Sequence, residues 1–472
     1  MRKNYKQLSL SEVYEECVNI FDNDKPMFLQ LLENTIDITK FIPRTFYNAF
    51  YQRFGRDRKY PLEGFVWSLI IQKIFAIPSD VLLIIILTIS KELREFCGFD
   101  KVPDGSKFTR FKQDFIRHIK DIFENLVDYT EPICRKIDTE LADMLIYDSS
   151  GIEAYVKENN PKFTSSLIRQ LKKSYKNNPD IDPYRMAYGL MPSRAEADEN
   201  VKQMYINGHF CYAHKFGILV NGLGIVRHIA FFDDEFKENH PELVVEKKSY
   251  SPDEDKTIGD SSSLQPVMND FFARHPNHRF GTFLGDSAFD KGDHYSFLKT
   301  ACRFNKVLIP INPRNSSDLP SVGYNEYGYP LCPNDNTLVM TYKGVTGGKA
   351  RTKRIKWGCP MFTKGICSCP NPCSTAKFGR TAYTYENQDF RMLPGIIRGS
   401  DEWNRLYKKR CAVERSLNHF KTNMCVGERK SRDTSTAKTD LFISGIAQLF
   451  SVVVAHALHK PHFFRSLKPL VA

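Results

Sequence analysis

Apolar residues recur at helical spacing through the first part of the chain. The pattern is clear in residues 10–21, 61–76 and 106–133, where apolar positions repeat every three to four residues. We therefore predict that residues 1–138 form an all-helical N-terminal domain. The basic stretch 53–61, RFGRDRKYP, separates two of these helices. Compact helical domains with basic loops suit DNA docking, although many such domains only bind other proteins.

The hydrophobic period changes near residue 140. Short apolar runs bounded by turn residues now alternate with helical segments, which predicts a mixed α/β domain over residues 139–311. The polar and basic residues 157–205 are interpreted as an excursion from its sheet. The predicted strands lie in residues 143–152, where the apolar run ends at Asp148, in 210–233 (two strands joined by a glycine-containing turn), in 279–290, where the run ends at Asp286, and in 306–312. The predicted helices cover residues 260–276 and 293–304.

Residues 312–400 break the pattern a second time. They are rich in proline, glycine and cysteine, so we predict an inserted module. Five of the twelve cysteines lie here, enough for a tetrahedral zinc site with one thiol to spare. The spacing is not a clean pair of C-x2-C knuckles, so a cluster of reduced cysteines is the alternative. If zinc binds, it stabilises a module too poor in core to fold alone. The candidate ligands are Cys332, Cys359, Cys367, Cys369 and Cys373.

Helical periodicity resumes near Glu402, and we predict that helices in residues 401–472 complete the α/β domain. The apolar run 81–89 is too short to cross a bilayer, and the run 441–458 is interrupted by Ser, Gln and His. We predict both as buried helices. The N-terminal residues lack the apolar core of a signal peptide. These features predict a cytoplasmic protein that does not bind a membrane and whose cysteines are reduced or metal-bound.

Composition narrows the class of partner. The chain has 472 residues, more than one compact domain usually holds, and 42% are hydrophobic, which excludes global disorder. Its formal net charge of +12 favours a polyanionic partner, nucleic acid or an anionic membrane, and does not choose between them.

Two aspartates share a local context. Asp148 and Asp286 each follow a short apolar run and precede small residues, so each is placed where a strand of an open α/β sheet ends. Two such carboxylates held close together repel unless a cation neutralises them, and Mg²⁺ prefers oxygen ligands of this kind. Taken singly, an aspartate after a strand is just as often a turn residue or helix cap.

The segment 406–421, LYKKRCAVERSLNHFK, is predicted as one helix with four polar residues on one face. At about 100° per residue, Tyr407, Arg410, Glu414 and Lys421 fall beside a separate apolar stripe. A solvated face with local ion pairs is the simplest interpretation of such a pattern. Glu414 could instead supply a third carboxylate to the two aspartates, the arrangement of two-metal phosphoryl transfer. On the strand 210–221, His214 and Lys215 are weaker candidates, because a strand histidine is more often structural.

These motifs together resemble the DD-E type of bacterial insertion-sequence transposases. The Y-x2-R-x3-E-x6-K spacing from Tyr407 to Lys421 resembles the Y-R-E-K signature of one large group of these enzymes. GDSAFD (285–290) and IYDSSGI (146–152) resemble its second and first Asp motifs. VPDGSKFTRF (102–111) is similar to the end of the helical domain that precedes the catalytic domain in many of them.

The resemblance implies a ribonuclease-H-like catalytic core with an N-terminal all-helical domain and a Cys-rich insertion before the last catalytic helix. It implies that Asp148, Asp286 and Glu414 are catalytic and hold two Mg²⁺ or Mn²⁺ ions. Tyr407, Arg410 and Lys421 would line the DNA track beside them.

The activity that the resemblance implies is DNA transposition in a bacterial cytoplasm. The enzyme would cleave DNA at the terminal inverted repeats of an insertion sequence and transfer the 3′-OH into target DNA, acting as a homodimer on DNA. The alternatives are a metal-dependent nuclease without strand transfer and a non-catalytic DNA-binding protein derived from a transposase.

Overall fold

A computed structural model divides the chain into two compact units. The first comprises Met1–Ile133 and His419–Ala472, and the second comprises Cys134–Asn418. The structure describes Ser9, Ser11 and residues 26–52, 57–176, 181–206, 209–243, 258–312, 323–325, 327–347, 353–385, 390–392, 394–428 and 431–470. The helix predicted over residues 10–21 therefore lies, apart from Ser11, outside the described residues.

The first unit is helical, as its periodicity predicts. A helix predicted across residues 106–133 is divided at Phe115, where the backbone leaves the helical region and α7 ends. The elements are α2 (Met27–Thr35), η1 (Ile38–Lys40), α3 (Arg44–Phe50), α4 (Leu62–Ile74), α5 (Asp80–Ile89), α6 (Lys91–Phe96), α7 (Gly105–Asp114), α8 (Ile116–Ile137), the π-helical turn η7 (His419–Asn423), α17 (Thr434–Ala457), η8 (Pro461–Phe463) and η9 (Lys468–Leu470).

Helix α17 is the core of this unit. It is long and apolar enough to cross a membrane, but 89% of its most apolar stretch is buried in the fold, where it packs on α2, α4 and α7. Its one buried carboxylate, Asp440, pairs with Lys112 at 3.0 Å and with Lys73 at 3.5 Å. These contacts place residues 419–472 with the N-terminal helices, whereas the sequence pattern assigned residues 401–472 to the α/β domain.

Helix α5 differs from its prediction as a buried helix. Only Leu83 and Leu87 of its apolar residues are buried, while Ile85 is 49% exposed and Ile89 77% exposed. An apolar run of this length covers every face of a helix, and only one face can meet the core.

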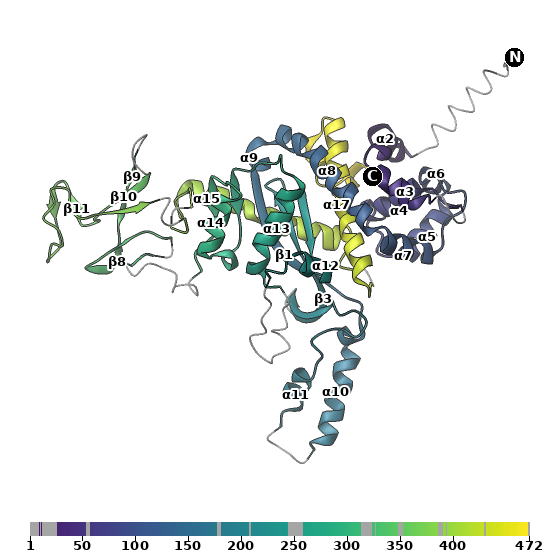
Figure 1. The fold of residues 1–472 in the computed structure, drawn as a ribbon, viewed down its shortest axis with the longest axis horizontal. Coiled ribbons are helices and arrows are strands. Elements are labelled where there is room, and N and C mark those ends of the chain that lie inside the picture. Colours follow the sequence, from purple (N-terminus) through teal and green to yellow (C-terminus); the bar gives the residue numbers. More distant parts are fainter. Residues whose placement is uncertain are drawn as a thin grey trace, which may run out of the picture. The chain divides into compact units, whose positions relative to one another are not determined.

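The second unit is built on a mixed six-stranded sheet (Figure 1). The strand order is β2-β3-β1-β5-β6, with β4 paired to β3. Strands β1, β3 and β4 pair antiparallel, and β5 and β6 continue parallel to β1. The strands are β1 (Met144–Glu153), β2 (Lys202–Ile206), β3 (His209–Asn221), β4 (Val226–Phe231), β5 (Thr282–Leu284) and β6 (Lys306–Leu308).

Helices cover the sheet, and the predicted excursion separates β1 from β2. Helix α13 lies along β1 (Figure 1), and the two share a hydrophobic core that includes Tyr147, Leu264 and Phe271. The remaining elements are α9 (Thr139–Ala142), η2 (Lys157–Asn159), α10 (Pro161–Ser174), α11 (Pro183–Gly189), α12 (Asp234–Asn239), α13 (Asp260–Arg274), η4 (Ser287–Phe289), α14 (Gly292–Thr300), α15 (Asp401–Tyr407), η6 (Lys408–Arg410) and α16 (Cys411–Asn418).

The predicted inserted module is a set of short strands with a small core. Its buried apolar cluster consists of Met340, Ile355 and Trp357. The strands form one three-stranded sheet and two hairpins: β7 (Leu331–Cys332) with β8 (Asp335–Val339), β9 (Thr341–Thr346) with β10 (Arg354–Gly358) and β13 (Thr381–Tyr385), and β11 (Phe362–Thr363) with β12 (Ile366–Cys367).

Candidate functional site

Asp148 lies within strand β1, not at its end as predicted. The strand continues to Glu153 because residues 148–153 keep their pairing with β3. Tyr147 packs in the core beneath α13, so alternation along the strand turns Asp148 to the opposite face. Its Oδ1 accepts a 2.8 Å hydrogen bond from the Ser149 backbone N–H, and Oδ2 faces away from that bond toward Arg410.

Asp286 follows β5, which pairs parallel with β1, so the second carboxylate arises from the neighbouring strand. The residue caps η4, because its Oδ1 accepts a hydrogen bond from the Ser287 N–H at 2.5 Å. The capping role that the sequence left open is therefore present. The other oxygen, Oδ2, faces Arg410, so the same side chain serves the local turn and the site.

Arg410 joins the three predicted carboxylates. Its Nη2 lies 3.4 Å from Asp148 Oδ2 and 3.3 Å from Asp286 Oδ2, and its Nη1 donates to Glu414 Oε1 at 2.5 Å. Helix α16, which carries Glu414, packs across β1 and β3 and so holds this carboxylate beside the sheet. One guanidinium thus occupies the position where three negative charges meet.

The electrostatics of the site follow from burial. Burial raises the pKa of the Asp148 carboxyl to about 6, although the Arg410 charge and the Ser149 N–H oppose the shift and Asp286 adds to it. Burial also raises the pKa of Tyr407 to about 12, so its hydroxyl stays protonated and donates to the Gly285 carbonyl at 3.4 Å. The site therefore holds a buried carboxyl group, that of Asp148, whose ionisation a divalent cation would favour.

The segment predicted as one helix is not continuous. Residues 408–410 form the 3₁₀ turn η6, and residues 419–423 form the π-helical turn η7. Tyr407, Arg410 and Glu414 still come together at the site. Lys421 lies in η7, which belongs to the first unit, and it is not among these contacts.

A fourth acidic residue near the site was missed from the sequence. Asp260, at the start of α13, accepts hydrogen bonds at 2.6 Å from Ser149 Oγ and forms an ion pair at 2.6 Å with Lys215. These three side chains line a cavity of about 140 Å³. The only signal was the cap-like run GDSSS. The pairing with Asp260 gives Lys215 a local partner, while His214 is buried against Phe231, as its structural interpretation expects.

The second aspartate of GDSAFD, Asp290, has a different environment. It is fully buried and forms a bidentate pair with Arg391, with distances of 2.9 and 2.7 Å. Tyr295 and the Asn312 backbone N–H donate to the same carboxylate. Asp290 therefore anchors the last part of the predicted insertion, through Arg391, to the core. Asp286 is the member of the motif that faces Arg410.

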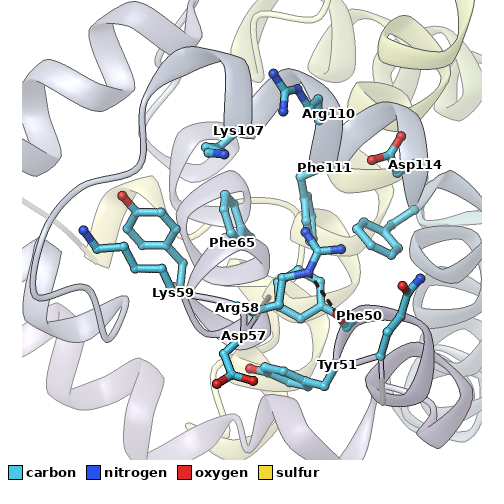
Figure 2. Close-up of a pocket in the computed structure, with 13 residues that line it drawn as sticks. Phe50, Tyr51, Asp57, Arg58, Lys59, Phe65, Lys107, Arg110, Phe111 and Asp114 are labelled. Carbon is cyan, nitrogen blue, oxygen red and sulfur yellow. Dashed lines mark hydrogen bonds between the residues drawn. The ribbon is translucent and has the colours of Figure 1, made fainter. Parts of the chain in front are cut away.

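The first unit contains a basic cavity with an aromatic floor. Figure 2 shows Arg58, Lys59, Lys107 and Arg110 around buried phenylalanine rings such as Phe111, in a cavity of about 490 Å³. Within the residues that the structure describes, no ion pair involves these four cations, although Arg58 stacks on Phe50. The predicted basic turn 53–61 contributes two of them, so a local excess of positive charge faces solvent here.

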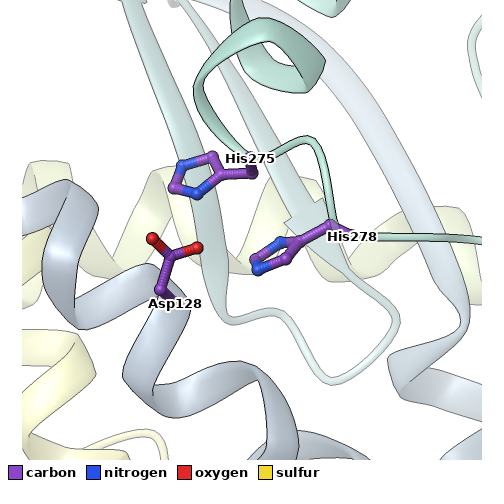
Figure 3. Close-up of side chains that lie close together, drawn as sticks. All are labelled: Asp128, His275 and His278. Atoms are coloured by element: carbon purple, nitrogen blue, oxygen red, sulfur yellow. The ribbon is translucent and has the colours of Figure 1, made fainter.

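Two histidines of the second unit lie close together. The rings of His275 and His278 stack with centroids 4.9 Å apart (Figure 3), and both residues are buried. Phe271 lies 5.2 Å from His275. Because both histidines are buried and pack on Phe271, the pair is part of the aromatic core around that residue. Asp128, also labelled in the figure, belongs to α8 in the first unit.

The five cysteines that the sequence proposed as zinc ligands form no disulfide in the structure. Among them, Cys369 hydrogen-bonds with Cys367. In the part of the chain that the structure describes, the groups of three or more metal-type side chains whose ligand atoms lie within 4.8 Å of one another include none of these five cysteines. The zinc site therefore stays a prediction.

Comparison with known proteins identifies one part of the chain. Residues 15–114 match a family described as "Transposase domain (DUF772)". No curated protein matches the chain. Among solved structures, a cryo-EM structure of a piggyBac transposase synaptic complex with hairpin DNA matches at 11% identity and a TM-score of 0.31, over 95% of this chain and 85% of that one. A TM-score this low does not establish a shared fold. The match over residues 15–114 supports a transposase.

Proposed function

We propose that the chain is a DNA transposase of the DD-E type that uses Asp148, Asp286 and Glu414. The observation that carries the proposal is the convergence of these three carboxylates, from two parallel strands and a later helix, on Arg410. An acidic cluster alone is common. Its occurrence in a chain whose residues 15–114 match a transposase domain favours DNA chemistry over a purely structural ion-pair network.

The sheet supports a ribonuclease-H-like core. Three antiparallel strands followed by two strands parallel to the first give the order β4-β3-β1-β5-β6. In this order Asp148 lies on β1 and Asp286 follows the adjacent strand β5, next to the helix that carries Glu414. The Tyr407–Arg410–Glu414 part of the Y-R-E-K signature lies at the same place.

The donor set fits divalent Mg²⁺ or Mn²⁺. Carboxylate oxygens are the preferred ligands of these ions, and the three side chains already direct oxygens at one cationic group. When bound, a pair of such ions activates a water or a 3′-OH and stabilises the leaving oxygen of the phosphodiester. With the ions bound, Arg410 would be free to meet a DNA phosphate, and the Tyr407 hydroxyl would keep its hydrogen bond to the Gly285 carbonyl.

The basic cavity of the first unit supports DNA binding outside the acidic site. Lys107 and Arg110 project from the exposed face of α7, one turn apart, and Arg58 and Lys59 face them. The four cations outnumber the two carboxylates that line the same cavity, Asp57 and Asp114, and so suit the phosphate backbone of the element's terminal inverted repeats. A transposase must also hold target DNA and bring two ends together, so we propose that it acts as a homodimer on DNA. We further propose that it does so in a bacterial cytoplasm.

Cleavage of the element's own ends tests the proposal. A linear fragment that carries the flanking inverted repeats is incubated with wild type and Glu414→Gln, in Mg²⁺ and in EDTA. We expect Mg²⁺-dependent nicking at the repeat ends by wild type and none by the variant. Glu402→Gln, on the exposed side of α15, is the matched control and should cleave normally.

The outcomes separate the alternatives. End-specific cleavage without joining of the 3′-OH to target DNA would indicate a nuclease. Tight end-specific binding by wild type with no cleavage in Mg²⁺ or Mn²⁺ would indicate a DNA-binding protein and refute the proposal.

A further inference from the structure

Helix α10, in the excursion that separates β1 from β2, carries cations along one face. These cations and two hydroxyl groups follow one another at spacings of three and four residues, so they fall within roughly 120° on the helix. No aspartate or glutamate lies in residues 160–176. We name this face the α10 stripe, and its exposed members are Lys162, Ser165, Ser166, Arg169, Lys172 and Lys173.

The opposite face of α10 is apolar and packs within the second unit. Phe163 and Leu167 pack against a buried cluster that includes Met191 and Tyr212, and Leu171 is itself buried. Helix α11 lies beside α10 (Figure 1). Because the apolar side of the helix is covered, the α10 stripe is the side that faces solvent.

Hydrogen bonds fix the start of α10 to strand β3. The Asn159 side chain donates to the carbonyls of Ala154 and Tyr212, at 2.7 and 2.8 Å, and accepts from the Tyr212 N–H at 2.7 Å. The next residue, Asn160, caps the helix, because its side chain accepts a hydrogen bond from the Lys162 N–H at 3.0 Å. These contacts join the stripe to the sheet at the end where the helix begins.

Most of the charge of the stripe is not neutralised within the chain. Another cation of the same excursion, Arg194, pairs with Glu199 at 3.0 Å. Among the residues that the structure describes, Lys162, Arg169 and Lys173 form no ion pair. Arg169 and Lys173, four residues apart, repel each other. An anion bound along this face would remove that repulsion.

We propose that the α10 stripe binds the phosphate backbone of duplex DNA, independently of the DNA sequence. From Lys162 to Lys173 the face is about 17 Å long, which matches about five phosphates of one strand. Side chains three or four residues apart lie about 5–6 Å from each other, so each can contact a different phosphate. Lysine and serine contacts of this kind position a duplex without reading its bases.

DNA fits this surface better than an anionic membrane does. The choice of DNA among polyanions rests on the proposed function, because the net charge alone suits either partner. An amphipathic helix binds a membrane by burying its apolar face between the lipids. In α10 that face is packed in the fold, so only the polar stripe is available. The stripe belongs to the second unit, and so adds a DNA contact to the basic cavity of the first.

Fluorescence anisotropy of the full-length chain on duplex DNA, in EDTA and over a salt series, tests the stripe. The variant combines Lys162→Ala, Arg169→Ala and Lys173→Ala, because alanine preserves the helix. Lys172 is kept, since its Nζ donates to the Tyr184 hydroxyl at 2.8 Å. We expect the slope of log K against log salt to fall by about three, and binding near 0.1 M salt to weaken on the order of a hundredfold. Two duplexes of unrelated sequence should lose equally.

The matched control removes three cations that already have carboxylate partners. Lys157→Ala, Arg194→Ala and Lys237→Ala together change the net charge by the same amount, and should leave the slope unchanged. A second variant, Arg169→Lys with Lys173→Arg, keeps the charge of the stripe and should bind as wild type does.

Ser166→Glu provides an independent measurement that removes no cation. It places a carboxylate in the exposed stripe, away from the packed face, and should reduce the salt slope by about one. It keeps the test decisive if the triple variant loses the helical circular-dichroism signal of wild type.

Four results would overturn the proposal. One is an unchanged salt slope in the folded stripe variants, and another is an equal loss in the paired-cation control. The third is a loss on only one of the two duplexes, which would indicate base reading. The fourth is stripe-dependent binding to phosphatidylserine vesicles with unchanged DNA binding, which would indicate a membrane surface. Binding in EDTA needs no cleavage, so failure of the proposed transposase activity would be a separate result.

Discussion

Replacing Asp148 with asparagine is expected to stabilise the metal-free protein at neutral pH. Burial raises the pKa of Asp148 to about 6 from an ordinary value of 3.8. The raised value means that folding favours the protonated carboxyl. The stability that the protonated Asp148 carboxyl contributes is complete below its pKa in the unfolded chain, and it is lost as the pH rises through about 6. At about 1.4 kcal/mol per pH unit, the charged form costs the metal-free fold about 3 kcal/mol at neutral pH.

Asparagine keeps the shape of the side chain and cannot ionise, so it removes this cost. Thermal and urea unfolding of both proteins in EDTA, from about pH 4 to pH 8, measure the effect. The variant should gain stability over wild type as the pH rises through 6. Mg²⁺ should then stabilise wild type and have no effect on the variant, because the ion needs the ionised carboxylate.

Asp290→Asn is the matched control, because it neutralises an aspartate of the same region that pairs with a different arginine. Asp290 is buried in a bidentate pair with Arg391, so breaking the pair is expected to cost about 3–5 kcal/mol. The two substitutions should therefore change stability in opposite directions. A destabilised Asp148→Asn in EDTA at neutral pH, or a difference independent of pH, would refute this account of the site's electrostatics.

Two further substitutions test the cationic groups. Lys107→Ala combined with Arg110→Ala should weaken DNA binding on every sequence and reduce the salt dependence of log K by about two, measured by fluorescence anisotropy in EDTA. Lys91→Ala removes another exposed lysine of the same unit, one paired with Glu95, and should leave both quantities unchanged. An equal loss in this control would contradict a local phosphate site. Arg410→Gln should destabilise the metal-free protein, since three carboxylates lose their common cation, and should enlarge the stabilisation by Mg²⁺ in a thermal-shift assay. A more stable metal-free Arg410→Gln would show that the carboxylates do not need that charge.

The sequence predicted the parts of the site that depend on local pattern. Short apolar runs identified the strands that carry Asp148 and Asp286, and helical periodicity identified the segment that carries Glu414. The position of Asp148 within β1 could not be predicted from the sequence, because the end of a strand depends on how far its partner strand continues. Asp260 was also missed, since a residue that resembles a helix cap gives no sign of the lysine that a distant strand brings to it.

Assignments that depend on tertiary partners were less successful. Helix α17 is apolar on nearly every face, so its sequence indicates burial without indicating which helices bury it. The buried Asp440 is the informative residue, because its partners Lys73 and Lys112 both lie in the N-terminal helices. A charged residue in a buried helix therefore identifies the neighbouring helices better than the apolar residues around it do. Helix α5 carries a similar apolar run, but its prediction as a buried helix was wrong, because four of its apolar positions are exposed.

A helical wheel of residues 406–421 shows only part of what Arg410 contacts. The wheel placed Arg410 on a face with Glu414, which predicts only a weak ion pair between residues four apart. In the fold, the 3₁₀ turn that ends at Arg410 lies where two adjacent strands each present a carboxylate, so the same guanidinium meets three negative charges. Such a group keeps the site assembled while no divalent cation is present. On the proposed function, a bound divalent cation would compete with this guanidinium for the same carboxylate oxygens and would free it to meet a phosphate of the DNA. Metal binding and phosphate binding would then be coupled.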